Sequence, residues 1–257
     1  MSIKKLYKDS LPLLAMLAIL PIWEIICRVF AIPNFILPAP SAIAEAFMQV
    51  SAERWFDNLW ATLRIALLGF GLSLLISIPL AIMMVSSKFL TKAVFPLLVI
   101  IQSTPVVAIA PLLIVILGTG DAPRLAITCL ITFFPLVVSA TTGMLSTPSE
   151  FIELSKSLNV SQAKTIWQIR LPYAIPHIFS GVKVAITLSV IGAVISEFVA
   201  AEKGLGYFVQ FSTSYFNIPQ AFAALVFLSA VSMLLFKSAH WIQKGFFAWS
   251  LPQDKSH

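Results

Sequence analysis

Six long runs of predominantly apolar residues dominate the chain and constrain its fold more than any other feature. Each run reaches the ~20 residues that a helix needs to cross a bilayer. Only 11% of the side chains are charged, whereas a soluble domain carries about 25%. The sequence therefore predicts an all-α integral membrane protein and argues against a soluble enzyme, a nucleic-acid-binding protein or a disordered chain. The runs cover residues 11–30, 59–85, 93–117, 123–145, 176–200 and 219–242.

The distribution of basic residues predicts how these runs are oriented. If the N-terminus starts in the cytoplasm, twelve of the seventeen Lys and Arg residues fall in inner segments. Because cytoplasmic loops carry the excess of positive charge, we expect both termini in the cytoplasm. The first run lacks a cleavage site and is expected to remain as a span. Within it, Glu24 and Arg28 are one helical turn apart and can form an ion pair.

The segment between the first two runs has a different composition. It contains three prolines and then an amphipathic stretch, Ser41–Arg54, that predicts a helix outside the membrane core. Asp57 or Asn58 can cap the next helix. We therefore divide the chain into an N-terminal part, 1–58, and a core, 59–257. A short turn, 86–92, separates the second and third runs.

The long cytoplasmic loop between the fourth and fifth runs, residues 146–175, carries helix signals of its own. Thr147–Glu150 has the spacing of a capping box, so a short helix is expected to extend to about Leu158. Asn159 can adopt the left-handed conformation that ends a helix. Ser161 can cap a second short helix that reaches Ile169. We expect Leu171–Pro172 to end that helix.

An apolar face on the first of these short helices needs a cover. Phe151, Leu154 and Leu158 are spaced three and four residues apart and share one side of the helix. An apolar face outside the membrane is covered either by the protein's own helix bundle or by another protein. The composition leaves both arrangements open.

The loop resembles the EAA motif of permease subunits in binding-protein-dependent ABC importers. Glu153-Leu154-Ser155, Asn159, Ile169 and Leu171-Pro172 match the spacing of every anchor in E-A-A-x3-G-x9-I-x-L-P. Leu154 and Ser155 replace the alanines, and Asn159 replaces the glycine. The resemblance implies a coupling helix that inserts into a cytoplasmic ATPase. The loop residues assigned to coupling are Glu150, Glu153, Leu154, Ser155, Leu158, Asn159, Ser161, Ile169, Leu171 and Pro172.

Other segments resemble the nitrate/sulfonate/taurine branch of this family. They are Leu37–Ser41, Pro111–Leu113, Gly118–Gly120, Ser196–Phe198 and Gly204–Tyr207. The resemblance implies a type I ABC importer fold in a bacterial inner membrane. A dimer is implied as well, with a second copy of the permease favoured. It also implies two ATPase subunits that bind ATP-Mg, and a periplasmic or lipid-anchored solute-binding protein. The implied solute is a small anion of the sulfonate, taurine or nitrate kind, or a thiamine-pyrimidine precursor.

Competing chemistries find little support in the residues. Gly118–Asp121 matches the G-x-G-D of intramembrane aspartyl proteases, but no second aspartate lies within a run. The chain has no P-loop, so ATP has to bind a separate subunit. No cofactor and no metal site is expected for this chain. The alternative from another class is an ion-coupled secondary transporter, which places coupling residues near the membrane midplane. The apolar runs carry few charges, which favours the ABC permease.

Polar side chains inside the runs are candidates for the translocation path. Gln102, Ser103 and Thr104 lie near the middle of the third run, where polar groups are costly against lipid. Hydrogen bonding between helices is the alternative explanation. Thr132, Ser189 and Glu197 are further candidates. Small residues at four-residue steps from Gly181 to Ala193 predict close helix packing in the fifth run.

Overall fold

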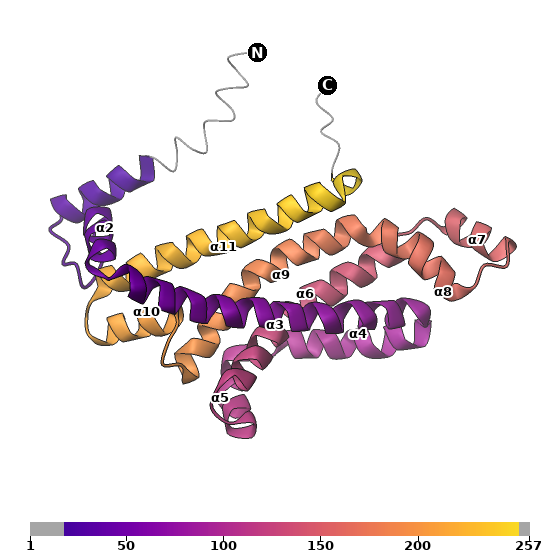
Figure 1. Cartoon of the computed structure of the whole chain (residues 1–257), viewed down its shortest axis with the longest axis horizontal. Coiled ribbons are helices and arrows are strands. Elements are labelled where there is room, and N and C mark those ends of the chain that lie inside the picture. The colour runs from indigo at the N-terminus through magenta and orange to yellow at the C-terminus, as the bar shows by residue number, and fades with distance from the viewer. Residues whose placement is uncertain (1–17, 252–257) are drawn as a thin grey trace, which may run out of the picture.

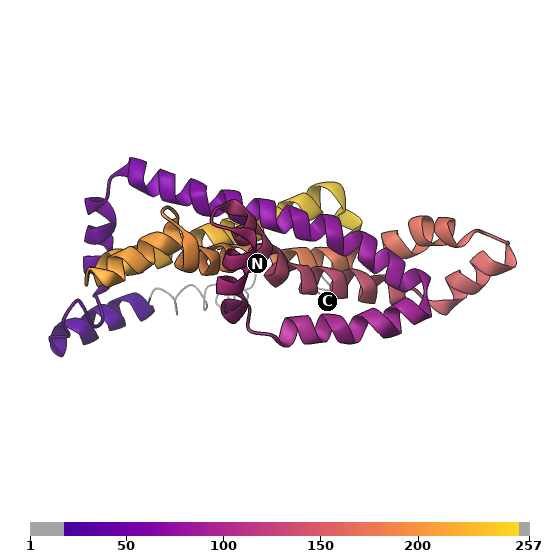
Figure 2. The ribbon, with the colours of Figure 1, turned by 90° about the horizontal axis from the view of Figure 1, so that it is seen from below.

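The computed structural model describes residues 18–251 and shows an elongated bundle of helices (Figure 1). The short helices α7 and α8 form one end of the bundle, and α2 with α10 forms the other (Figures 1 and 2). We call these the α7 end and the α2 end. Every regular element from residue 18 to residue 251 is helical, so the predicted all-α fold is confirmed.

Four helices are long and apolar enough to cross a membrane. They are α3 (Ala52–Ser86), α6 (Asp121–Leu145), α9 (Leu171–Ala200) with the turns that precede it, and α11 (Ile218–Phe246). They match the second, fourth, fifth and sixth apolar runs. The first run is described only from residue 18, as a helix over 18–29, and its residues 11–17 lie outside the described part. Six complete spans therefore remain a prediction.

The third apolar run, predicted as a single span, is two helices in the structure. α4 (Lys88–Ser103) and α5 (Val106–Leu117) meet at a bend of 95°. Pro105 explains the break, because a proline has no backbone N–H to donate and disfavours a helical conformation at the preceding residue. Thr104 accordingly has an extended backbone. In Figure 1, α5 projects away from the bundle, below α3.

The core of the bundle is the contact between α6 and α9, which lie side by side. Glycines make this approach possible: a Cβ on Gly181 would lie 2.6 Å from Cβ of Ser139. A Cβ on Gly192 would lie 2.9 Å from Cα of Thr128. The small residues of the fifth run therefore serve helix packing, as their spacing predicted.

The N-terminal boundaries differ from the sequence-based expectation. The amphipathic helix, α2 (Pro40–Gln49), ends before Arg54, because Ser51 starts α3 by accepting a hydrogen bond from the Arg54 N–H at 3.4 Å. Asp57 and Asn58 therefore lie inside α3 and do not cap it. The turn predicted over 86–92 is reduced to Ser87. The Glu24–Arg28 ion pair is confirmed, at 2.6 Å.

Aromatic rings hold the α2 end together. The indole of Trp55 stacks on Phe47 with ring centroids 4.8 Å apart, and its N–H donates to the Phe47 carbonyl at 3.0 Å. Phe208 of α10 (Leu205–Ser214) and Phe227 of α11 pack against the same indole. This cluster joins α2, α3, α10 and α11. The predicted boundary at residue 58 lies inside α3, and Trp55 on one side of it packs against Phe208 and Phe227 on the other.

Candidate functional site

The loop at the α7 end begins without the predicted capping box. α7 (Ser149–Ser157) follows Pro148, and no side chain caps it. The Thr147 hydroxyl instead donates to the Met144 carbonyl at 3.0 Å, in a buried position at the end of α6. Pro148 occupies the N-cap position with a non-helical backbone, so the helix starts one residue later than a proline at its first position would require.

The turn between the two loop helices has the predicted geometry. Asn159 has a φ of +54°, in the left-handed region. The N–H groups of Asn159 and Val160 donate to the carbonyls of Lys156 and Ser155, each at 2.9 Å, which is the pairing of a Schellman motif. Ser161 then accepts from the Lys164 N–H at 3.4 Å and caps α8 (Gln162–Thr165).

The second loop helix does not end at Leu171–Pro172. A π-turn over Ile166–Arg170 leads directly into α9, so that residues 162–199 form one continuous helix. The prediction was wrong because it treated Pro172 as a terminator. A helical proline clashes with the carbonyl four residues earlier. Here the Leu171 N–H bonds to Ile166, five residues back, and this wider turn accommodates the proline ring.

Side-chain hydrogen bonds fix the loop to itself and to the bundle. The hydroxyls of Ser155 and Thr165 are buried and 2.5 Å apart, which ties α7 to α8. The Gln162 amide donates to the Ser86 carbonyl at 2.7 Å, at the end of α3. The loop is therefore mechanically connected to both α3 and α9.

The apolar face of α7 is not covered by the chain's own bundle. Phe151, Leu154 and Leu158 are 50%, 56% and 67% exposed, and Trp167 adds a fourth side chain at 62%. Of the two arrangements left open by the composition, the structure rules out folding back onto the bundle. Trp167 was missed by the sequence reasoning, although a tryptophan in a loop between two apolar runs was a usable signal.

A first prediction concerns the turn at Asn159. The change Asn159→Val places a β-branched side chain in the left-handed region, which costs about 1–2 kcal/mol and more for a branched residue. We expect this variant to show a several-fold loss of transport with unchanged amounts of protein in the membrane. Asn159→Gly, which tolerates this backbone, is the matched control and is expected to keep full transport. Equal uptake by both variants would contradict the assigned role of the turn.

A buried carboxylate organises the opposite end. Glu197 is 1% exposed and accepts the Gly206 N–H through Oε2 at 2.7 Å. The two preceding N–H groups donate to α3: Gly204 to Asn58 Oδ1 at 2.9 Å, and Leu205 to Thr62 Oγ1 at 2.8 Å. Three side chains thus satisfy the start of α10 and fasten it to α3 and α9. Glu197 is therefore not a water-exposed charge at a helix end.

A polar cavity of about 900 Å³ lies beside this carboxylate. Arg64, Arg124, Lys203 and Tyr207 are among its lining residues. Arg64 forms an ion pair with Asp121 at 2.7 Å, which joins α3 to the start of α6. The cavity is thus lined by charges of both signs at the α2 end, opposite the exposed loop.

The candidate path residues occupy different environments. Gln102, Ser103 and Thr104 are exposed at the bend between α4 and α5. Thr132 is fully buried and hydrogen-bonds to Ser73 of α3. Ser189 is also fully buried and bonds to Ile186 of its own helix. The structure therefore brings only the first three to an accessible surface, and none of these five residues lines the cavity at Glu197. In residues 18–251, no cluster of His, Cys, Asp or Glu is arranged to hold a metal ion.

The apolar helices and the exposed apolar face of α7 define a membrane protein with a surface for a partner outside the bilayer. Residues 73–248 match the family described as "binding-protein-dependent transport system inner membrane component". The chain belongs to this family. The predicted resemblance to ABC importer permeases is thereby confirmed. The chain is a multi-pass permease of an ABC importer, a component that is not itself an enzyme.

Several relatives match nearly the whole chain. A probable ABC transporter permease of Haemophilus influenzae is 32% identical over 93% of this chain and 97% of its own length. The formylaminopyrimidine transport permease ThiX of Halalkalibacterium halodurans is 32% identical over 97% of this chain and 100% of its own length. The taurine transport permease TauC of Escherichia coli is 25% identical over 90% and 86%.

Solved structures share the fold. A chain of the inward-facing MetNI methionine ABC transporter superposes with a TM-score of 0.64, at 19% identity, over 72% of this chain and 93% of its own. An amino acid ABC transporter solved with histidines gives a TM-score of 0.59, at 14% identity, over 80% and 94%. At these identities the likeness concerns the fold alone, and it is that of ABC transporter membrane subunits.

Proposed function

We propose that the exposed face of the loop is the surface through which a separate ATPase drives this permease. The observation that supports it is the exposure of Phe151, Leu154, Leu158 and Trp167 outside the spanning part of the helices. Exposed apolar side chains of this kind fit a groove on another protein. The coupling residues are those assigned from the sequence: Glu150, Glu153, Leu154, Ser155, Leu158, Asn159, Ser161, Ile169, Leu171 and Pro172. ATP-Mg binds the ATPase and not this chain.

The complex we propose contains two permease copies, two ATPases and a binding protein. The spanning helices of a single copy are at most 39% buried over their most apolar windows, which leaves surface for a second copy. α5 supports the dimer, because Leu112, Val115 and Ile116 are exposed on a helix that projects from the bundle. The α7 end and both termini lie in the cytoplasm. The binding protein docks at the α2 end.

Movement of the loop reaches the spans through its two attachments. The π-turn joins α8 to α9 without a break, and Gln162 holds the end of α3. When two ATPases close on ATP, we expect the loops of the two copies to approach and α9 to carry α6 with it. Residues Gln102, Ser103 and Thr104, at the bend of α4 and α5, line the path in this scheme. Thr132 and Ser189 contribute to the path indirectly, because they pack the helices around it. Glu197 contributes by fixing the position of α10.

The proposed solute is a small polar heteroaromatic compound of the formylaminopyrimidine kind. A relative named for that transport is 32% identical over 97% of this chain, and one named for riboflavin transport is 32% identical over 93%. Relatives named for nitrate and taurine are 25% identical. Small anions of the sulfonate, taurine or nitrate kind are therefore the second choice.

The test is uptake by cells or proteoliposomes that contain the permease with its neighbouring ATPase and binding protein. We expect saturable uptake of labelled formylaminopyrimidine, which is lost when ATP is depleted and retained when a protonophore collapses the ion gradient. Taurine and nitrate serve as competitors. The reverse pattern, with uptake sensitive to the protonophore and indifferent to ATP, would contradict the proposal and support an ion-coupled transporter.

A further inference from the structure

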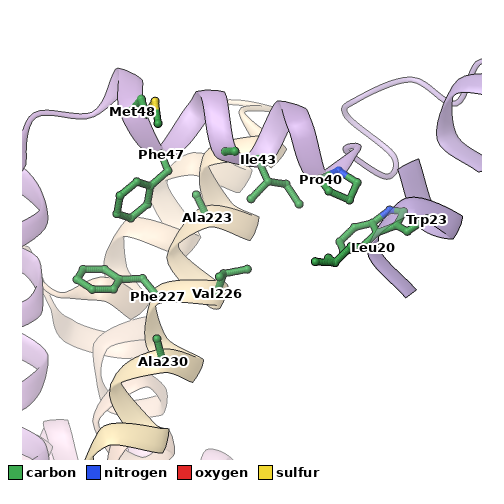
Figure 3. A pocket seen from close by; sticks show the side chains of 11 residues that line it. Leu20, Trp23, Pro40, Ile43, Phe47, Met48, Ala223, Val226, Phe227 and Ala230 are labelled. Atoms are coloured by element: carbon green, nitrogen blue, oxygen red, sulfur yellow. The ribbon is translucent and has the colours of Figure 1, made fainter. Parts of the chain in front are cut away.

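An apolar groove of about 500 Å³ lies between helix 18–29, α2 and α11 (Figure 3). Its walls are Leu20 and Trp23 from the first helix, Ile43 and Phe47 from α2, and Val226 and Ala230 from α11. The remaining lining residues are also apolar. No described part of the chain fills it, and a groove of this size without polar partners does not hold ordered water.

The groove lies at the depth of lipid acyl chains. Ala223 and Ala230 line it, five and twelve residues after the start of α11, which places them about 7 and 18 Å along that helix. α11 is itself long and apolar enough to cross the membrane. In a hydrocarbon core roughly 30 Å thick, this range falls mainly in the leaflet at the α2 end.

An exposed cation lies on the helix that carries Trp23. Five residues further along the helix, the Arg28 side chain is 70% exposed. It donates through Nε to Glu24 at 2.6 Å and through one terminal nitrogen to Ser41 at 3.5 Å. A guanidinium has five N–H groups, so donors remain for another acceptor.

We propose that this groove is a binding site for one phospholipid of the bilayer. One acyl chain occupies the apolar groove, and the phosphate lies near Arg28. The Glu24 carboxylate does not oppose the phosphate strongly, because it is engaged by Arg28 and by both the N–H and the hydroxyl of Ser41. A bound lipid would fasten helix 18–29 and α2 to the α11 side of the core. This site is independent of the ATPase surface and of the transported solute.

The test is photo-cross-linking of the full-length permease, with its ATPase, in nanodiscs of phosphatidylethanolamine and phosphatidylglycerol. A small fraction of the lipid carries a diazirine in one acyl chain, and peptides are mapped by mass spectrometry. We expect labelling concentrated on α2 and the first half of α11. Ala230→Trp fills the groove and should reduce that labelling roughly tenfold, because displaced methylenes lose their apolar burial. Met233→Trp, on the same helix but outside the groove lining, is the control and should not reduce it.

A second variant separates the charge from the shape of the groove. Arg28→Gln removes the guanidinium and leaves the groove lining unchanged, and we expect about two- to fivefold weaker retention of lipid during detergent washing. Unselective labelling of all lipid-facing helices would overturn the proposal, because it indicates bulk lipid only. The proposal would also be overturned if the lipid does not label the groove because residues 1–17 or another protein occupy it. Equal labelling in the Ala230→Trp and Met233→Trp variants would do the same.

Discussion

Leu154→Asp will abolish transport while leaving the permease in the membrane. Leu154 is 56% exposed at the centre of the apolar face of α7, so the substitution costs the isolated permease little. In the complex, the carboxylate has to be buried against an apolar groove. Loss of such a contact residue costs about 2 kcal/mol or more, or about 30-fold in affinity. The measurement is the amount of ATPase that co-purifies with the tagged permease, together with ATP-dependent uptake.

The matched control for this prediction is Leu154→Met. Methionine keeps the volume and apolar character of the side chain, so co-purification and uptake should stay near the wild-type level. If the aspartate variant retains normal ATPase binding and uptake, the α7 face does not contact the ATPase. If both variants lose the ATPase equally, the loop depends on leucine for its own fold, and thermal unfolding of the permease will reveal that.

Gly204→Val will prevent the permease from accumulating in a folded form. Gly204 has a φ of +133°, a region that is essentially restricted to glycine, and holding another residue there costs about 1–3 kcal/mol. A Cβ at this position would also collide with the carboxyl group of Glu197. Overpacking adds about 1–3 kcal/mol. Together these losses are a large share of the stability of a typical protein, about 5–15 kcal/mol.

Two other glycines separate the contributions of strain and collision. Gly118 also has a positive φ, +79°, but open space surrounds the position of its Cβ. Gly71 lies inside α3 with open space and no backbone requirement. We expect the order of damage to be Gly204→Val, then Gly118→Val, then Gly71→Val, measured as the amount of folded permease recovered from the membrane. A Gly204→Val variant as stable as Gly71→Val would contradict the assigned turn geometry.

A related variant tests the carboxylate itself. Glu197→Ala leaves the Gly206 N–H buried without its acceptor, and the loss of one such partner costs about 1–3 kcal/mol. Glu197→Gln keeps an acceptor oxygen of similar shape and is expected to lie much closer to the wild type. Thermal unfolding checks both. Equal destabilisation by the two variants would show that the negative charge matters, and not only the acceptor.

The sequence identified the elements that depend on local chemistry. The left-handed turn follows from Asn159, and the cap of α8 follows from Ser161, because both depend on residues a few positions apart. The ion pair of Glu24 with Arg28 follows from helical spacing. The family also follows from the spacing of short motifs along the chain.

Predictions failed where neighbouring elements compete for the same segment. The third run was treated as one span because it is long and largely apolar, although the polar residues Gln102–Thr104 and Pro105 interrupt it at the 95° bend. Pro172 resembles a helix terminator, but a π-turn allows the helix to pass through it. The capping box at Thr147 failed because that hydroxyl bonds to Met144 instead.

By itself, the sequence determined a polytopic helical permease with a structured loop, because hydropathy, turn chemistry and motif spacing are properties of the chain alone. Only the tertiary structure decided that the α7 face stays uncovered and that Glu197 is buried beneath the start of α10. Both outcomes depend on distances between residues far apart in sequence. The approach of Asn58 and Thr62 to the N–H groups of Gly204 and Leu205 is one such distance, and no local pattern encodes it.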